Sequence, residues 1–463
     1  MEKIDSIRTF ESWLEPCLNF ERTPEKNIFW LDTMRFLCDR FSRPESFAPC
    51  FHVAGSKGKG SISALIASIL DAAGFRTGLY TSPHILDFVE RVSAAKGPFQ
   101  KEVYDRAVRE ITEGMRSVSK KELPGEREVT WFDFATLFSF LVFRQAKVDY
   151  AVYEVGLGGR LDSTNVVSPI CACIGPIELE HTEYLGDTIE KIAAEKGGVI
   201  KENSVAVIAG QRPSVRKIFE AIAVGKNARI IFIDELVGNL AFRIKNISGS
   251  IPVMSVSFSS GIFARPIKTD MRLLGGFQAE NAALAAVAVK TALPSITEDA
   301  IERGLAAASL PGRFEIIKKP RGFESVPFVV LDGAHTVSSV GFTMENMRRI
   351  FPSSPKILLF ACAADKDAEG IAPLFKGEFD GIFLTRPGEA KRSDPRALAR
   401  AFDAAGLSYD CSDDYRTQIK NALGKAGEAG APLLVTGSFY LVAEVKKILA
   451  DFPSVDIDPR DAF

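Results

Sequence analysis

A glycine-rich stretch close to residue 55 is the clearest place in the sequence where chemistry could occur. Residues 52–61 read HVAGSKGKGS, so two lysines lie among glycines and serines directly after a short apolar run. The backbone N–H groups of such a loop can bind phosphate oxygens, and a lysine can neutralise their charge. The spacing departs from the general phosphate-loop pattern of glycine, four residues and Gly-Lys-Ser/Thr. Taken alone, the stretch is either a phosphate-binding loop or a flexible turn.

The residues on both sides of this stretch favour phosphate binding. Residues 50–54 form a short apolar run that predicts a strand, and residues 77–81 predict another. Between them, apolar residues recur with the spacing of a helix, at Ile62, Leu65, Ile66, Ile69 and Leu70. Gly74 is well placed to end that helix. The glycines therefore fall where a parallel strand passes to a helix N-terminus, which is the position that a phosphate loop requires.

Two further polar side chains follow strand-like runs. Glu154 ends the run in VDYAVYEVGLGG, and His181 follows ICACIGPIELE. In open parallel sheets, ligands bind outside the carboxyl ends of the strands. We therefore expect Lys59, Glu154 and His181 to lie near one another.

The whole chain is predicted to form two α/β parts. The first fifty residues predict helices, with apolar positions at Phe29, Leu31, Met34, Phe36 and Leu37. The runs SVAVIAG and ARIIFIDEL predict further strands. From Pro311 the strand-to-loop pattern restarts in FVVLDGAHT, KILLFACAADKD, GIFLTRPG and LLVTGSFY. Because Pro311 and Gly312 interrupt the preceding helix, we expect domains at residues 1–308 and 309–463.

The composition gives no reason to expect a nucleic-acid or membrane partner. Fifty-seven Lys and Arg against 59 Asp and Glu leave a formal charge of −2. The sequence has no apolar run of about 18 residues and no signal peptide at its acidic start. The seven cysteines are scattered, mostly in apolar settings, which indicates buried thiols in a reducing cytoplasm. We expect a cytoplasmic monomer.

Several longer segments point to a known family. The segments GSKGKGS, YTSPH with ER at Glu90-Arg91, EVGLGGRLDSTN, EHTEYLGDTIEKIAAEKGG, GGFQAENAALA, LPGRFE, LDGAH and TGSFYLVAEV occur in this order between residues 50 and 445. In type and order they resemble the motifs of folylpolyglutamate synthases and dihydrofolate synthases, members of the Mur ligase superfamily. The resemblance implies an α/β fold, with a P-loop-containing Mur-ligase-type ATPase domain and a second, smaller Rossmann-like α/β domain.

The resemblance also implies an ATP site. The family's own phosphate loop has the spacing found here, which makes Lys59 the phosphate-binding lysine and leaves Lys57 at a variable position. By the same resemblance, Arg313 lies near the γ-phosphate, where its planar charge could neutralise the transferring group. The matching nucleotide-binding positions are Gly55, Lys57, Gly58, Lys59, Gly60, Ser61, Asn281, Arg313, Asp332 and His335.

A metal site and a modified lysine are implied in the same way. Ser82, Glu154 and His181 match ligands of a divalent metal, normally Mg²⁺, although a histidine ligand also suits Mn²⁺. Lys196 matches a lysine that the family often carries as a carbamate. Two residues depart from the family pattern: Glu180 and Thr336 stand where aspartate and asparagine are usual.

The implied reaction is the ATP-dependent joining of L-glutamate to dihydropteroate or a reduced folate. The substrate carboxylate attacks the γ-phosphate, and the amine of glutamate displaces phosphate from the acyl phosphate. The catalytic positions implied are Lys59, His181, Lys196 and Arg313. The matching positions for the pterin substrate are Trp131, Phe132, Asp133, Leu161, Asp162 and Ser163.

Other functions account for less of the sequence. A Mur ligase acting on a UDP-sugar peptide typically carries a UDP-binding domain before the phosphate loop, and only residues 1–51 precede it here. A P-loop kinase or nucleotide-dependent switch explains Lys59 and Glu154 but not the matching segments after residue 310. A binding protein without activity fits least, because every matched phosphate and metal position keeps a competent residue.

Overall fold

The computed structural model describes residues 4–17, 30–245, 250–352, 355–389 and 392–450. It divides the chain into two compact units. The first unit comprises Met1–Arg243, Ser255–Arg272 and Gly276–Ser309, and the second comprises Ile244–Met254, Leu273–Gly275 and Leu310–Phe463. The predicted helical position Phe29 lies outside the described residues.

The first unit is built on a sheet with the strand order β3-β2-β4-β1-β5-β6-β7. All neighbours in it run parallel except β3, which is antiparallel to β2. The central strands are apolar and buried along their whole length, as expected of a parallel sheet covered on both faces. The strands are β1 (Cys50–Ala54), β2 (Thr77–Tyr80), β3 (Val92–Ala94), β4 (Tyr150–Glu154), β5 (Cys171–Ile174), β6 (Val205–Ile208) and β7 (Arg229–Phe232).

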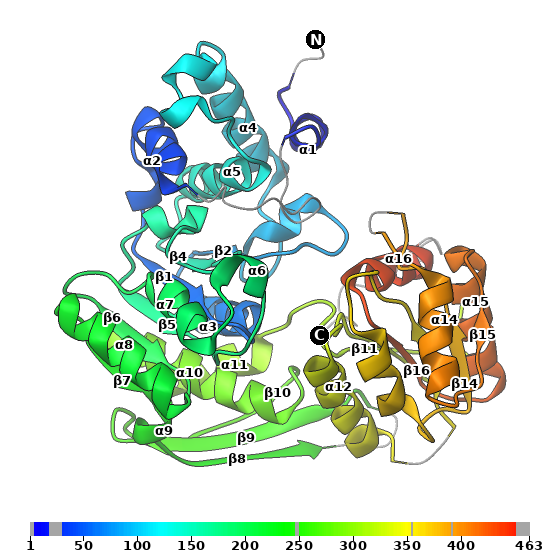
Figure 1. Cartoon of the computed structure of the whole chain (residues 1–463). Coiled ribbons are helices and arrows are strands. Elements are labelled where there is room, and N and C mark those ends of the chain that lie inside the picture. The colour runs from blue at the N-terminus through cyan, green and yellow to red at the C-terminus, as the bar shows by residue number, and fades with distance from the viewer. Residues whose placement is uncertain (1–3, 18–29, 246–249, 353–354, 390–391, 451–463) are drawn as a thin grey trace. The chain divides into compact units, whose positions relative to one another are not determined.

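Helices cover both faces of this sheet. Helix α3 (Lys59–Ala72) packs on β1, β2 and β4 and lies beside α10 (Gly276–Ala292) and α11 (Glu298–Ala307) (Figure 1). From β1 to β2 the chain adds strands toward one edge of the sheet, and from β2 to β4 it turns back toward the middle. Because crossovers between parallel strands are right-handed, α5 (Trp131–Ala146), which joins β2 to β4, lies on the face opposite to α3. There the ring of Phe140 lies 5.1 Å from that of Tyr153 in β4. Helices α7 (Ile189–Gly197) and α8 (Pro213–Gly225) form a hydrophobic core cluster with β5 and β6.

Helices of the N-terminal part pack around α5. They are α1 (Ile7–Leu14), α2 (Leu31–Arg40) and α4 (Lys101–Met115). The short helices of this unit are α6 (Thr182–Leu185) and α9 (Ile233–Leu236). The helices expected in the first fifty residues and the strands expected at SVAVIAG and ARIIFIDEL are therefore confirmed where residues are described. No helix among the described residues is long and apolar enough to cross a membrane.

A small additional sheet has the order β10-β9-β8 and was not predicted. Its strands are β8 (Val237–Lys245), β9 (Val253–Ser260) and β10 (Ile267–Met271). Strand β9 alternates buried and half-buried residues, whereas β8 is exposed along most of its length. The exposed strand has little hydrophobic pattern, which is the signal that sequence-based recognition needs.

The second unit is built on a sheet with the order β11-β12-β16-β13-β14-β15. Its neighbours run parallel except β11, which is antiparallel to β12. The strands are β11 (Glu315–Lys318), β12 (Phe328–Leu331), β13 (Ile357–Phe360), β14 (Gly381–Leu384), β15 (Asp410–Cys411) and β16 (Leu433–Thr436). Strands β12, β13, β14 and β16 confirm the four strands expected in FVVLDGAHT, KILLFACAADKD, GIFLTRPG and LLVTGSFY. Strands β11 and β15 were not predicted.

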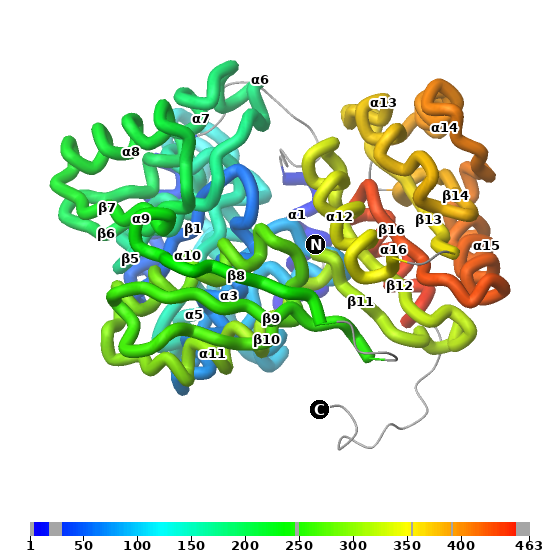
Figure 2. Tube along the Cα trace, turned by 90° about the horizontal axis from the view of Figure 1, so that it is seen from below, coloured from blue at the N-terminus to red at the C-terminus, as the bar shows by residue number. Residues whose placement is uncertain are grey.

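Helices of the second unit follow the strands in turn. They are α12 (Val337–Ile350), α13 (Ala368–Ile371), α14 (Pro395–Ala404), α15 (Tyr415–Glu428) and α16 (Phe439–Ala450). Helices α13 and α14 lie side by side and α14 packs on β14 (Figure 2), while α15 packs on β13, β14 and β16. This alternation of parallel strands and helices is the Rossmann-like arrangement expected from the sequence.

Candidate active site

The glycine-rich loop after β1 is folded tightly, at two positions where only glycine fits. Gly55 has a φ of 143°, and a Cβ there would lie 2.9 Å from the backbone of Gly175. Gly58 has a φ of 79°, and a Cβ there would lie 2.6 Å from Oδ1 of Asn281. Side chains rarely adopt such φ values, and both neighbours leave no room. The glycine-rich loop is therefore a specific structure and not a flexible turn. The predicted residue Asn281 lies against it, beside Gly58.

The loop ends at the N-terminus of α3, which begins at Lys59. The first N–H groups of a helix have no acceptor within it, and the helix dipole adds partial positive charge there. In α3 these groups belong to Lys59, Gly60 and Ser61. The preceding N–H groups of Ser56 and Lys57 donate to the carbonyl oxygen of Pro176, at 2.9 and 3.4 Å. The first residues of the turn are therefore fixed by hydrogen bonds, and its last residues supply the N–H groups at the start of α3.

Two lysines meet at one carbonyl oxygen of this loop. The Nζ atoms of Lys59 and Lys196 both donate to Gly55 O, each at 3.0 Å. Lys196 comes from α7, is 1% exposed, and forms an ion pair with Oε1 of Glu180 at 2.8 Å. Burial, and then the charge of Lys59, lowers the pKa of Lys196 to about 8. Lys196 is thus part of the phosphate-loop structure and not a solvated helix lysine.

Glu180 stands where the family usually has aspartate, and its position explains how the longer side chain is used. Burial raises its pKa, but the charges of Lys59 and Lys196 outweigh burial and hold the pKa below its usual value. The carboxylate thus contacts Lys196 directly and is also stabilised by the charge of Lys59.

Of the three predicted metal ligands, the structure brings Ser82 and Glu154 together. Glu154 ends β4, is 3% exposed, and accepts the backbone N–H of Ser82 on Oε2 at 3.0 Å. His181 is exposed, has a φ of 46° and directly precedes α6. Within the described ranges, no group of three or more His, Cys, Asp or Glu side chains could hold a metal ion. That finding does not bear on the predicted set, because the set contains only two such residues.

The predicted pterin residues Asp133 and Ser163 also lie together. Ser163 donates from Oγ to Oδ1 of Asp133 at 2.6 Å. The other oxygen of Asp133 accepts the hydroxyl and the N–H of Thr130, at 2.7 and 3.1 Å, and so caps α5. Asp162 accepts the N–H of Leu157 at 2.9 Å. Burial raises the pKa of both aspartates, and these hydrogen bonds oppose it. Both carboxylates thus organise the loop after β4.

The aromatic pair at the start of α5 is only partly open. Trp131 is 7% exposed, and the guanidinium of Arg91 lies over its ring at 4.6 Å. Phe132 is half-buried and lies against Gly156, where a Cβ would be 2.5 Å from the ring. Leu161 is half-buried as well. Of the two predicted aromatic residues, Phe132 is the more exposed.

The second unit gathers its own predicted residues. The guanidinium of Arg313 lies 4.0 Å from the ring centroid of Phe439. Asp332 accepts the hydroxyl of Thr343 at 2.6 Å, and burial raises the pKa of Asp332 to about 6 against the opposing effects of Thr343 and Arg313. His335 donates from Nδ1 to the carbonyl oxygen of Gly333 at 2.7 Å, since a carbonyl can only accept.

Thr336, the second departure from the family pattern, has a local role. It is the N-cap residue of α12, and its hydroxyl accepts the N–H of Ser339 at 3.2 Å. Threonine and asparagine are both good N-cap residues. The substitution therefore preserves the start of the helix that follows the predicted nucleotide residues Asp332 and His335.

Three residues near these groups were given no role in the sequence analysis. Arg91 covers Trp131, and Phe439 lies under Arg313. Gln278 donates to the hydroxyl of Ser61 at 3.1 Å and accepts from Asn281 at 3.0 Å. All three lie in or beside the quoted segments, but their contacts join parts of the chain far apart in sequence.

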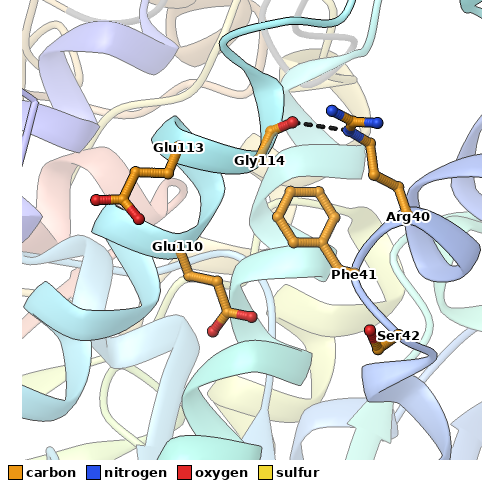
Figure 3. A pocket seen from close by; sticks show the side chains of 6 residues that line it. All are labelled: Arg40, Phe41, Ser42, Glu110, Glu113 and Gly114. Atoms are coloured by element: carbon orange, nitrogen blue, oxygen red, sulfur yellow. Dashed lines mark hydrogen bonds between the residues drawn. The ribbon is translucent and has the colours of Figure 1, made fainter.

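A surface hollow of about 430 Å³ lies elsewhere in the first unit (Figure 3). It is formed between the end of α2 and α4, and Arg40 closes one side by donating to the carbonyl oxygen of Gly114 at 2.7 Å. Its lining residues are Arg40, Phe41, Ser42, Glu110, Glu113 and Gly114. None of the predicted site residues is among them.

Comparison with known proteins extends this description. The Mur ligase middle domain model matches residues 53–289, and the Mur ligase glutamate ligase domain model matches residues 312–439. The chain is 32% identical over 455 residues to the dihydrofolate synthase/folylpolyglutamate synthase of Bacillus subtilis (strain 168), covering 95% of this chain and 98% of that protein. It is 31% identical to the protein of the same name from Mycobacterium tuberculosis, covering 91% and 88%.

Solved structures agree. Folylpolyglutamate synthase of M. tuberculosis complexed with ADP and AMPPCP superposes with a TM-score of 0.82 at 27% identity, covering 97% of this chain and 99% of that one. Escherichia coli FolC in complex with DHPP and ADP gives a TM-score of 0.79 at 26% identity, covering 96% and 98%. The fold is therefore that of a Mur ligase. Within that class, the chain belongs to the folylpolyglutamate synthase/dihydrofolate synthase family, which confirms the expected family and fold class.

Proposed function

We propose that this chain joins L-glutamate to dihydropteroate or a reduced folate at the expense of ATP. The observation that carries the proposal is the phosphate loop at the start of α3, with Lys59 and Lys196 on one carbonyl oxygen. Its support is similarity along nearly the whole chain to dihydrofolate and folylpolyglutamate synthases, and similarity to structures that contain ADP, AMPPCP or DHPP.

The reaction needs activation because a carboxylate is a poor electrophile. An oxygen of the acceptor carboxylate attacks the γ-phosphorus of ATP, the bond to ADP breaks, and an acyl phosphate forms. The amine nitrogen of glutamate then attacks the acyl carbon, phosphate leaves, and the nitrogen loses a proton. In this proposal the N–H groups of Lys59, Gly60 and Ser61 bind phosphate oxygens, and the cationic side chains of Lys59 and Arg313 neutralise the charge that builds up.

A divalent metal fits the residues present. Ser82 and Glu154 offer hard oxygen donors, which suit Mg²⁺, and a histidine such as His181 also suits Mn²⁺. The metal would supply further charge neutralisation at the phosphates. We also propose, from the family resemblance, that Lys196 is carbamylated. Its lowered pKa supports this, because CO₂ reacts with the uncharged amine.

Replacement of Glu154 tests the metal proposal. Glu154→Gln keeps an oxygen that can accept the N–H of Ser82 but removes the charge. We expect Mn²⁺ binding, measured by electron paramagnetic resonance of the purified protein, to weaken at least about tenfold. The control is Glu183→Gln, at the exposed second residue of α6, and this variant should bind Mn²⁺ as the wild type does. Equal Mn²⁺ binding by the Glu154 variant and the wild type would contradict the assignment.

The acceptor is tested directly with the purified protein, ATP, Mg²⁺ and L-glutamate. Dihydropteroate and tetrahydrofolate are offered separately, and products are analysed by mass. We expect one or both acceptors to gain one glutamate residue while ADP is released. ADP release without that gain in mass would overturn the proposal and favour a kinase or a nucleotide-dependent switch. A UDP-sugar peptide is offered in a further reaction, and gain of an amino acid only on that peptide would assign the chain to cell-wall synthesis instead.

The remaining expectations from the sequence are proposals of the same kind. We propose a domain boundary near residue 309 and a cytoplasmic monomer without nucleic-acid or membrane partners. The substrate positions Trp131, Phe132, Asp133, Leu161, Asp162 and Ser163 also rest on the resemblance. Light scattering of the purified protein, with and without ATP, tests the oligomeric state.

A further inference from the structure

The segment TGSF, residues 436–439, is a matched motif to which the proposed reaction gives no role. It forms the turn between β16 and α16. Gly437 has a φ of 101°, and a Cβ there would lie 2.4 Å from the carbonyl oxygen of Ala361. The N–H of Gly437 donates to Ala334 O at 2.8 Å, and the hydroxyl of Thr436 donates to the same oxygen at 3.3 Å. The turn is therefore locked against the loop after β12.

This turn directs the ring of Phe439, the first residue of α16, onto the backbone of Gly333. A Cβ on Gly333 would lie 2.2 Å from the ring, so the position is open only because residue 333 is glycine. The ring of His335 lies edge-on at 6.2 Å. The other feature of this site is the guanidinium of Arg313, 4.0 Å from the ring centroid.

The segment that carries Arg313 is tied to the same place. The N–H of Gly333 donates to Gly312 O at 2.9 Å, and the N–H of Gly312 donates to Glu315 at 2.8 Å. Glu315 in turn accepts from Nζ of Lys446 in α16, at 2.8 and 2.9 Å. Three segments distant in sequence, around residues 312, 333 and 439, are thus tied together, and the guanidinium of Arg313 lies over the ring of Phe439.

We propose that Phe439 is a positioning residue that holds Arg313 in the orientation in which it acts on the transferring phosphoryl group. The inference rests on the proposed function. A ring face attracts a guanidinium placed over it, which restricts a long and otherwise mobile side chain. Unlike a carboxylate partner, the ring does not neutralise the charge. Because the ring contacts the face of the guanidinium, the N–H groups at its edge can donate hydrogen bonds to phosphate oxygens.

The test is a graded change in the electron density of the ring at constant shape. Phenylalanine carrying one to five fluorine atoms is incorporated at position 439, and glutamate ligation is measured with saturating acceptor. We expect kcat to fall with each added fluorine, to about one fifth for the pentafluoro ring, while KM for the acceptor stays constant. Phe439→Leu should show a similar loss, and Phe439→Trp or Phe439→Tyr should retain near wild-type kcat.

Controls separate this role from a purely structural one. Phe379→Leu removes a half-buried ring of the same unit, which packs on Phe375 with the ring centroids 5.9 Å apart. It should lower the melting temperature about as much as Phe439→Leu but leave kcat unchanged. Arg313→Ala should lower kcat, and the residual kcat of that variant should not respond to fluorination.

The outcomes are distinguishable. A flat fluorination series in an enzyme that forms the glutamate product, and loses activity with Arg313→Ala, overturns the positioning role and leaves the proposed function intact. Absence of glutamate product with the wild-type protein overturns both. A fall in kcat along the series that persists in Arg313→Ala also overturns the inference, because the ring would then act independently of Arg313.

Discussion

Lys59→Ala should abolish amide formation, with a loss in kcat of about a thousandfold or more. The side chain follows the tight glycine turn and starts α3, whose N-terminus is the proposed phosphate-binding position, so its removal takes a positive charge away from the transferring group. In the structure its Nζ lies on Gly55 O at 3.0 Å, a contact that a phosphate oxygen can replace. The fold should survive, because Lys59 is only half-buried and Lys196 keeps its own contact with Gly55.

The matched control is Lys57→Ala, two residues earlier in the same loop. Lys57 contributes its backbone N–H to Pro176 O, which alanine preserves, so we expect little change in kcat. ADP release and product mass measure activity, and circular dichroism during heating measures the fold. Retained activity in Lys59→Ala, or a larger loss in Lys57→Ala, would mean that the wrong lysine has been assigned. Nothing in the structure explains why Lys57 itself is a lysine.

Much of the fold that positions this loop can be predicted from the sequence. The apolar run at residues 50–54 and the helical spacing from Ile62 to Leu70 predict a strand and a helix, and both are present as β1 and α3. These elements are recognisable because they are buried almost throughout and therefore carry strong hydrophobic patterns. Strand β8 carries no such pattern, since most of its side chains face solvent, and β15 has only two residues.

The candidate site is harder to predict from the sequence, because its contacts join residues that are far apart in the chain. Lys196 lies in AAEKGG, which looks locally like the end of any solvated helix, and only the fold buries it beside Glu180 and Gly55. Arg91 and Phe439 likewise acquire meaning only from the side chain that each one covers or supports. By contrast, Gly55 and Gly58 are predictable, because a strand-to-helix turn imposes backbone angles that glycine accommodates.

Lys196→Ala should reduce kcat about a thousandfold. This effect is large for a residue that is so far in sequence from the N-terminus of α3. The substitution removes a donor to Gly55 O at 3.0 Å and the ion-pair partner of Glu180 at 2.8 Å, both in the interior. It leaves the Glu180 carboxylate without its ion-pair partner. The matched control is Lys191→Ala in the same helix, whose side chain is 61% exposed and pairs with Asp187 on the surface. That variant should keep full activity.

Small molecules added to Lys196→Ala then identify the chemical form of the missing group. If the working side chain is a carbamate, as we propose, acetate should restore part of the activity, because it supplies a carboxylate to the cavity. Supplying ¹³CO₂ to the wild-type protein should also give a carbamate carbon signal that Lys196→Ala lacks. Restoration by methylamine and not by acetate would contradict carbamylation. It would instead make Lys196 an ammonium whose function is the one its present contacts describe, holding Gly55 and Glu180 together behind the phosphate loop.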